Sequence, residues 1–321
     1  DAFWQLCLRS TSLKLEIAGC AIDCLRATPM FRLSSICRQV FPIPVADWRD
    51  PHSISSELDV KTSDAMITRL ESRGKDPVFQ SLFDTYFGHV IQSSSKVLEV
   101  GAGTGVICRA LVARGFSGLL VGSDQSPTFI ETAKQLALGE GLPAERVKFV
   151  VADARNLKVD LKADDFDCLI MHTLISHVDD PLLVLKAARE VVQTGASLII
   201  VDGDYSGLAY HSSTDSGLAE SVSKALVSAT FASPGVVRDL PKLLRASGWE
   251  LQSTHGTCVS EMGKQFSYWK SFAEAYMPRV IGSGLLDEAK VKAWWDEQQR
   301  LAQAGHFFAA CTYYTIIAKA I

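Results

Sequence analysis

The stretch that decides the fold is Lys96-Val-Leu-Glu-Val-Gly-Ala-Gly-Thr-Gly105. A short apolar run is followed by glycines at 101, 103 and 105, directly before a segment whose apolar residues have helical spacing. Glycines lack a Cβ atom, so they permit a tight turn and let a ligand lie against the backbone, while the free amides of the next helix attract an anionic group. The stretch therefore predicts a strand, a ligand-binding loop and a helix in succession.

Short apolar runs and helical segments alternate from this loop to about residue 201. Strands are expected at 96–100, 119–123, 147–151, 167–171 and 197–201. Helices are expected near 63–73, 77–90, 105–114, 127–138, 181–192 and 235–247, and two later strands at 249–259 and 307–319. Such alternation is typical of βαβ units and predicts an α/β fold built on a parallel sheet.

An acidic residue ends the second expected strand. Asp124 follows Val-Gly-Ser, where it can accept hydrogen bonds from two ribose hydroxyls, as acidic residues do in nucleotide-binding βαβ units. A nicotinamide dinucleotide is the rival ligand, but the third place of its G-x-G-x-x-G pattern is Val106 here. Glu99, two places before the first glycine, would favour a cationic sulfonium and ammonium. These features favour S-adenosyl-L-methionine over NAD.

Four motifs in this order resemble class I S-adenosylmethionine-dependent methyltransferases, in particular the small-molecule branch similar to ubiquinone and menaquinone biosynthesis enzymes. The resembling stretches are 97–105, 122–126, 151–154 and 166–178. The resemblance implies a Rossmann-like, seven-stranded, mostly parallel sheet with helices on both faces. It places the three glycines along the methionine part of the cofactor, Asp124 on the ribose and Asp153 at the adenine. The implied cofactor-binding residues are Glu99, Gly101, Ala102, Gly103, Thr104, Gly105, Asp124, Gln125, Asp153, Ala154 and His172.

Two histidines near the end of the fourth expected strand are the candidate catalytic residues. His172 and His177 are suited to act as a general base near neutral pH, although a place in the pocket wall or at a helix cap is the structural alternative for His177. No set of metal ligands is apparent, so no metal is expected. Candidate substrate-binding residues follow the fifth strand: Tyr205, Tyr210, His211, Arg238 and Trp269.

The chain beyond this core suggests how the acceptor would be enclosed. We expect an N-terminal helical extension or lid over 1–90 and a methyltransferase domain over 91–321, with a helical insertion at about 260–305. The insertion is rich in aromatic residues that either roof an acceptor pocket or pack in the core. Extension and insertion together are expected to cover the C-terminal edge of the sheet and to exclude water there.

Composition bounds the partners. Hydrophobic residues make up 47% of the 321 residues, charged residues 21%, and the formal net charge is −4. That charge gives no broad positive field for nucleic acid, and no apolar run is long enough for a membrane span. Eight scattered cysteines favour reduced thiols and a cytoplasmic protein, with an organelle as the alternative if 1–45 derive from a targeting segment. A small-molecule substrate is expected, and a homodimer stays open.

The predicted function is methyl transfer from S-adenosyl-L-methionine to an O, N or C atom of a small molecule. Two other classes fit the same cofactor motifs, because fold does not fix function. One is a cofactor-binding scaffold that does not methylate, either a pseudoenzyme or a pericyclic catalyst. The other is a protein methyltransferase.

Overall fold

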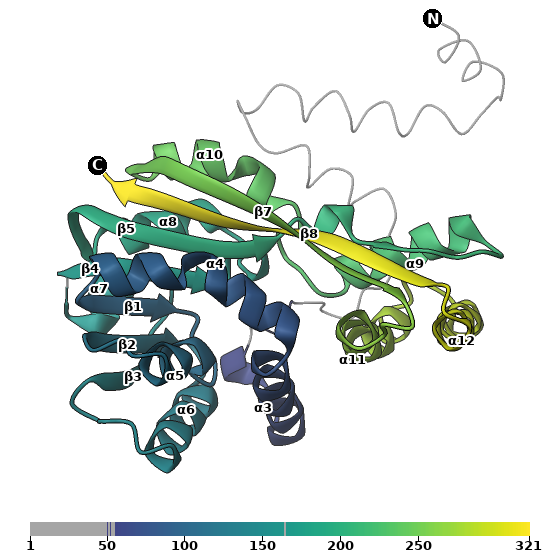
Figure 1. Ribbon diagram of the computed structural model, residues 1–321, viewed down its shortest axis with the longest axis horizontal. Coiled ribbons are helices and arrows are strands. Elements are labelled where there is room, and N and C mark those ends of the chain that lie inside the picture. The colour runs from purple at the N-terminus through teal and green to yellow at the C-terminus, as the bar shows by residue number, and fades with distance from the viewer. Residues whose placement is uncertain (1–49, 51, 53–54, 164) are drawn as a thin grey trace, which may run out of the picture. The chain divides into compact units, whose positions relative to one another are not determined.

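An eight-stranded sheet forms the centre of the computed structural model, which describes residues 50, 52, 55–163 and 165–321 (Figure 1). Its strand order is β3-β2-β1-β4-β5-β8-β6, with β7 paired to β8. The parallel strands are β1 Lys96–Val100, β2 Leu119–Asp124, β3 Val147–Val151, β4 Phe166–His172 and β5 Val192–Gly203. The antiparallel strands are β6 Ala209–Tyr210, β7 Trp249–Gly263 and β8 Phe307–Ala320.

Sequence patterning predicted the parallel strands to within a few residues, but the number of strands differs. The resemblance implied seven strands, and the eighth is the two-residue β6, which pairs with β8 through Ala209 and Tyr210. Two residues are too few to produce a recognisable alternation of apolar and polar side chains, so this strand has no sequence signal of its own.

Helices cover both faces of the sheet (Figure 1). One face packs against α4 Pro77–Ser93, α5 Val106–Ala113 and α6 Pro127–Gly139, whose apolar side chains form one core cluster. The other face packs against α7 Leu157–Leu161, α8 Pro181–Arg189 and α10 Val236–Ala246 in a second cluster. Asp76, Ser126 and Asp180 cap their helices with a side-chain oxygen directly before a proline.

The long strands β7 and β8 extend past the parallel sheet and carry the added helices. Their pairing runs from Trp249–Ala320 to Gly263–Phe307, while β5 pairs only with the C-terminal part of β8. Helices α9 Ser216–Ser228, α11 Tyr268–Gly282 and α12 Glu288–Ala304 lie at this far end (Figure 1). The expected insertion is therefore a helix pair between two strands, and α9 adds a third helix that the sequence pattern did not define.

The segment before the sheet contributes η2 Ser55–Glu57 and α3 Val60–Gly74. Of the expected extension over 1–90, the parts before residue 50 lie outside the described residues, as does the expected targeting segment. Within the described part of the chain, no helix is both long and apolar enough to cross a bilayer.

Candidate functional site

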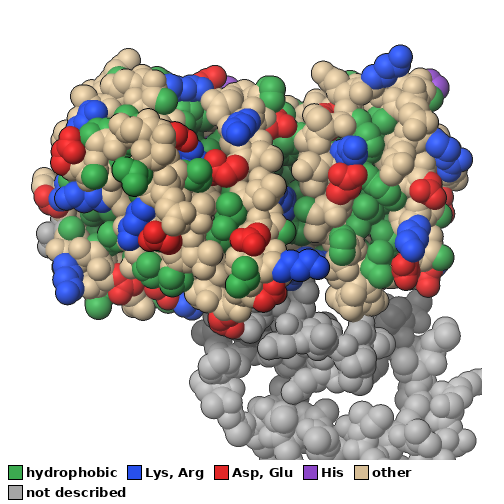
Figure 2. Space-filling view, turned by 90° about the horizontal axis from the view of Figure 1, so that it is seen from below, with side chains coloured by type: hydrophobic (Ala, Val, Ile, Leu, Met, Phe, Trp, Pro, Cys, Tyr) green, Lys and Arg blue, Asp and Glu red, His purple; other side chains and the backbone are tan. Residues whose placement is uncertain are grey.

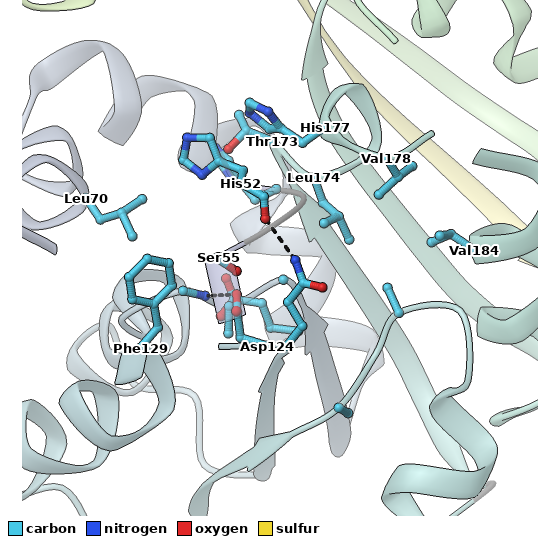
Figure 3. Close-up of a pocket in the computed structure, with 18 of the residues that line it drawn as sticks. His52, Ser55, Leu70, Asp124, Phe129, Thr173, Leu174, His177, Val178 and Val184 are labelled. Atoms are coloured by element: carbon cyan, nitrogen blue, oxygen red, sulfur yellow. Dashed lines mark hydrogen bonds between the residues drawn. The ribbon is translucent and has the colours of Figure 1, made fainter. Parts of the chain in front are cut away.

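A cleft lies at the C-terminal edge of the parallel strands, where β1 and β4 are neighbours and the chain order reverses. Ligands of open α/β sheets bind at such switch points. This strand-end cleft has about 1370 Å³ of empty space, its open mouth included. Asp124 and Phe129 lie on one side of it and His52 and His177 on the other (Figure 3).

The glycine loop gives the cleft its floor. Gly101, Gly103 and Gly105 have φ angles of +74°, +54° and +77°, a region that side-chain-bearing residues rarely adopt. A Cβ atom on Gly105 would lie 2.6 Å from the ring of Phe149, and one on Gly101 would lie 2.7 Å from Leu174. The backbone conformation therefore favours glycine at all three positions, and the Phe149 ring adds a steric limit at Gly105.

Asp124 ends β2 beside this loop and holds it. Its two carboxylate oxygens accept hydrogen bonds from the Gly103 and Ser126 amides, each at 2.9 Å. Burial raises the pKa of Asp124, while these amide donors oppose the shift. Each carboxylate oxygen has a second lone pair, so the side chain can still accept hydrogen bonds from ribose hydroxyls. The neighbouring Gln125 donates to the His52 carbonyl at 2.9 Å.

Glu99 is a buried acid at the end of β1. One of its oxygens accepts hydrogen bonds from the amide of Cys108 at 3.1 Å and from its thiol at 3.0 Å. Burial raises the pKa of Glu99 to about 7. The carboxyl lines the strand-end cleft, so a cationic ligand there would favour its ionised form.

The third strand brings Asp153 and Ala154 to the same cleft. The Asp153 carboxylate forms an ion pair with Arg155 at 2.6 Å, and hydrogen bonding to this guanidinium lowers the pKa of Asp153. Asp153 therefore stays ionised and can accept a hydrogen bond from an amino group of a ligand. Arg155 competes with the ligand for the same carboxylate. Ala152 and Phe129 line the same cleft.

His172 lies at the end of β4 in the wall of the cleft. Its Nδ1 is 2.9 Å from the Tyr86 hydroxyl, and its Nε2 is buried without a hydrogen-bond partner among the described residues. Burial, with the Arg73 charge as a smaller cause, lowers the pKa of His172 to about 3. A histidine with so low a pKa is neutral and a weak base, so its position favours ligand contact over proton removal.

His177 has a different environment, although it lies only five residues away. Its Nδ1 is 2.7 Å from a carboxylate oxygen of Asp50, whose side chain is fully buried. Nδ1 is thereby occupied, whereas Nε2 makes no hydrogen bond to any residue the structure describes. A base oriented by a carboxylate is the arrangement used in general-base catalysis.

Asp50 and His52 both lie against His177. The rings of His52 and His177 are 4.3 Å apart, and the His52 amide donates to Asp50 at 2.8 Å. Burial and the neighbouring His177 lower the pKa of His52 well below its usual value. His52 is therefore a neutral side chain next to the candidate base.

Helix α3 is attached to the glycine loop by a hydrogen bond and to α5 by an ion pair. Glu71 accepts a hydrogen bond from Thr104 at 2.6 Å and forms an ion pair with Arg109 at 2.7 Å. Arg109 also forms an ion pair with Glu140. Thr104 is fully buried, so it contributes to the loop's position. Leu70 and Arg73 of the same helix line the strand-end cleft.

A second cavity, with about 620 Å³ of empty space including its open mouth, adjoins the first, and His177 and Arg73 line both. We call it the aromatic cavity, because its walls include the rings of Tyr205, Phe231, Tyr268, Phe272, Tyr276 and Tyr313. Of the five predicted acceptor residues, the structure brings Tyr205 to this cavity.

The other four predicted acceptor residues do not line either cavity, as far as the described residues define the two cavities. Tyr210 and Trp269 are buried, and the Tyr210 hydroxyl donates to the Trp269 carbonyl at 2.7 Å. Arg238 is exposed and forms an ion pair with Asp204 at 2.8 Å. His211 is exposed at the far end of the added helices. Core packing explains the first two positions and an ordinary surface contact the third.

Several cleft residues lacked a sequence signal. His52, Arg73 and Phe79 of the cleft, and Asp50 behind His177, come from segments before the glycine loop, and none belongs to a recognisable motif. Thr173 follows His172 with a φ of +55°, which is unusual for a β-branched residue and marks a constrained point at the strand end. Its hydroxyl accepts a hydrogen bond from Arg73 at 2.6 Å.

This fold and cleft agree with a family assignment. A family model described as a methyltransferase domain matches residues 91–276, which is more than half of the chain. The chain belongs to this family and, with the cofactor motifs in place, to the class I S-adenosylmethionine-dependent methyltransferases. S-adenosyl-L-methionine is the cofactor of that class.

Relatives with similar sequences point to the same family. An uncharacterized 37.1 kDa protein from a Streptomyces fradiae transposon is 25% identical over 70% of this chain and 62% of its own length. A ubiquinone biosynthesis O-methyltransferase from Haemophilus ducreyi is 30% identical over 33% of this chain and 44% of its own length. A tRNA U34 carboxymethyltransferase from Dichelobacter nodosus is 32% identical over 39% of this chain and 38% of its own length. The chain thus covers less than two thirds of each.

Solved structures show the same fold. A protein of Bacillus halodurans described as a methyltransferase has a TM-score of 0.51 at 16% identity, covering 73% of this chain and 97% of that one. The YcgJ protein of Bacillus subtilis has the same TM-score and identity, covering 75% and 98%. At this identity the likeness supports the Rossmann-like fold alone.

Proposed function

We propose that this protein transfers a methyl group from S-adenosyl-L-methionine to a small molecule, with His177 as general base and Asp50 as the residue that orients it. One observation carries the proposal. The strand-end cleft, with its methyltransferase motifs, and the adjoining aromatic cavity share His177. A base at that boundary can contact an acceptor in one cavity while the methyl donor occupies the other.

The residues of the strand-end cleft fit the cofactor. The loop at 101–105 leaves its floor free of Cβ atoms at the three glycines, Asp124 keeps acceptor capacity, and the buried Nε2 of His172 lacks a partner among the described residues. Glu99 and Asp153 add negative charge suited to a cationic ligand. When bound, S-adenosyl-L-methionine supplies an electrophilic methyl group.

The chain's own contribution is positioning and proton removal. In-line methyl transfer depends mainly on holding the acceptor atom in a near-attack position. His177 Nε2 would take the proton from an acceptor hydroxyl, and Asp50 would stabilise the resulting imidazolium through Nδ1. Ring contacts of His177 with His52 and Phe231 fix the plane of the imidazole.

A small acceptor is favoured over a polyanion. On the face shown in Figure 2, acidic and basic side chains are interspersed and no broad basic patch is visible among the described residues. The formal net charge is −4, so no long-range attraction to RNA is expected. We also propose that the substrate is soluble and that the reaction takes place in the cytoplasm. The enzyme would be a monomer or a homodimer.

Mass spectrometry can test the proposal. The purified protein is incubated with methyl-labelled S-adenosyl-L-methionine and a small-molecule extract, and the products are compared with those of His177→Ala. A labelled methylated product that forms with the wild type and not with the variant supports the proposal. Cofactor binding without any labelled product, from extracts of several sources, would favour the scaffold that does not methylate.

A further inference from the structure

The shape of the aromatic cavity restricts its occupant. The rings of Tyr205 and Phe231 stack with centroids 3.6 Å apart and planes 15° apart, and the Phe272 ring lies almost parallel to Phe231. These rings come from segments after β5, after α9 and within α11, and all three line the cavity, so separate parts of the chain contribute flat apolar surface to it. Flat walls of this kind pack best against a planar ring.

Two arginines give the same cavity a positive charge. Arg69 and Arg73, both on α3, line the aromatic cavity. Within the described part of the chain, neither forms an ion pair with a carboxylate. The Arg69 guanidinium lies 4.2 Å from the centre of the Tyr276 ring. Arg73 donates from one nitrogen to Thr173, while its buried Nε has no hydrogen-bond partner among those residues.

The acidic groups near the cavity are already engaged. Asp76 is the carboxylate in the lining, and it caps α4 by accepting from the Val78 amide at 2.8 Å. Asp50 is bound to His177, and Asp202 accepts hydrogen bonds from Ser176 and Gly203. Two guanidinium groups thus face a single capping carboxylate, which disfavours a cationic amine and favours an anion.

The far side of the cavity offers neutral hydroxyls. The Tyr313 hydroxyl is 3.2 Å from that of Tyr205 and 2.8 Å from that of Tyr268. Burial raises the pKa of each of these tyrosines, so they remain protonated hydrogen-bond donors and add no negative charge. A ligand oxygen can therefore be bound without charge repulsion from this side.

We propose that the aromatic cavity is the acceptor site and takes a planar aromatic molecule that carries an anionic oxygen, bound by Arg69 and Arg73 next to His177. An arginine fork pairs with a carboxylate through two hydrogen bonds and with an ionised phenol through one. The link to methylation rests on the proposed function, whereas the binding preference rests on the cavity alone.

Calorimetry with three matched probes tests this preference without cofactor turnover. The probes are 3,4-dihydroxybenzoate, its neutral amide 3,4-dihydroxybenzamide and the cationic 3,4-dihydroxybenzylamine. We expect the benzoate to bind about tenfold more tightly than the amide, and the amine most weakly, because charge-assisted hydrogen bonds are the stronger kind. Each titration is repeated with S-adenosylhomocysteine present.

Variants of α3 locate the binding. Arg69→Gln and Arg73→Gln should each reduce benzoate affinity about tenfold towards that of the amide. Lys61→Gln removes one exposed positive charge from the same helix, outside the cavity, and should change affinity less than about twofold. Arg69 makes no hydrogen bond within the described residues, so Arg69→Gln remains informative even if Arg73→Gln fails to fold.

The outcomes separate the two proposals. Benzoate preference that is lost in Arg69→Gln supports the anionic acceptor site, whether or not S-adenosylhomocysteine binds. Failure of S-adenosylhomocysteine to bind, with the benzoate preference intact, contradicts the proposed function and leaves the cavity assignment standing. Equal affinity for the three probes, or a benzoate affinity unaffected by both arginine substitutions, would overturn the cavity assignment.

Discussion

The strand-end cleft and the aromatic cavity meet at His177 but have opposite charge. Acidic side chains outnumber the two arginines, Arg73 and Arg155, in the lining of the cleft, whereas Arg69 and Arg73 outnumber the one carboxylate, Asp76, in the lining of the cavity. An acidic cleft suits a cationic methyl donor, and a basic cavity suits an anionic acceptor. If the proposed assignment holds, the two ligands are distinguished by charge.

The two regions also differ in how they are built. Backbone conformation and amide donors make the floor of the cleft, within one stretch from Glu99 to Gly105 and the ends of two adjacent strands. The cavity is made of side chains from α3, η3 Ile175–His177, η4 Tyr205–Gly207, α11 and β8. Substitutions should therefore affect cofactor binding mainly at the loop and acceptor binding mainly at the cavity.

The largest expected effect is on chemistry at the boundary. His177→Ala should lower kcat about 10²- to 10⁴-fold, the usual loss for a general base, while S-adenosylhomocysteine still binds. Steady-state kinetics with an identified acceptor, beside calorimetry, measures both. His211→Ala removes an exposed histidine outside both cavities and should leave kcat unchanged. A His177→Ala enzyme with wild-type kcat would remove this residue from the mechanism.

The next effect concerns the floor of the cleft. Gly105→Ala should destabilise the protein by about 2 to 4 kcal/mol, because a positive φ and an overlap with Phe149 add together. Gly141 has a φ of +71°, and a Cβ atom added there would meet nothing within 4 Å, so Gly141→Ala isolates the backbone cost of about 1 kcal/mol. Urea unfolding measures both variants.

The affinity for S-adenosylhomocysteine gives a second comparison of Gly105 and Gly141. Gly105→Ala should also weaken S-adenosylhomocysteine binding, whereas Gly141→Ala should not. If both variants lost equal stability and bound the ligand equally well, the close contact around Gly105 would have no consequence and the floor of the cleft would need another explanation.

Asp124→Ala should weaken cofactor binding by about 1 to 3 kcal/mol, because charged hydrogen bonds to ribose hydroxyls are lost. The same carboxylate holds the Gly103 and Ser126 amides, so thermal unfolding is measured alongside calorimetry. Asp124→Asn keeps one acceptor oxygen and should fall between the wild type and the alanine variant. An unchanged dissociation constant in Asp124→Ala would exclude a ribose contact.

The smallest effect depends on pH through Glu99. Its raised pKa of about 7 means that the carboxyl is mostly neutral at pH 6 and largely ionised at pH 8. The affinity of S-adenosyl-L-methionine relative to S-adenosylhomocysteine should then increase about two- to fivefold from pH 6 to pH 8, equivalent to about 0.5 to 1 kcal/mol for a partly screened charge pair. Calorimetry at both pH values measures the ratio.

Glu99→Gln provides the control for that pH dependence. The variant should show a ratio that does not change with pH. A folded-state pKa above the ordinary value also means that ionisation opposes folding, so stability contributed by this group falls as pH rises from about 4.5 to 7. Glu99→Gln should therefore gain stability relative to the wild type above pH 7. A wild-type ratio that stays constant with pH would place the carboxyl too far from the sulfonium.

Sequence reasoning located residues of the strand-end cleft most readily where they belong to one local stretch of chain. The glycines at 101, 103 and 105 lie at backbone turns and Asp124 ends β2, and both features leave a pattern within a few residues. Because the strands are parallel, these groups lie together at the C-terminal edge of the sheet, so no further sequence signal is needed to predict that they are neighbours.

The acceptor side left no such pattern. Arg69, Phe231 and Tyr276 become neighbours only through packing of α3 and α11 beyond β5, and an arginine or tyrosine on a helix is ordinarily a surface or core residue. Aromatic content therefore pointed to Trp269, which the fold buries, as readily as to Tyr205, which lines the cavity. Asp50, the partner of His177, lies 127 residues before it in the chain.

The most direct test of the cofactor assignment is calorimetric titration of the wild-type protein with S-adenosylhomocysteine and with NAD. The glycine spacing, Asp124 and Glu99 predict binding of the adenosyl ligand in the micromolar range and no comparable binding of NAD. Binding of NAD as tight as that of S-adenosylhomocysteine, or no binding of S-adenosyl-L-methionine and S-adenosylhomocysteine to a folded protein, would contradict the assignment of the strand-end cleft.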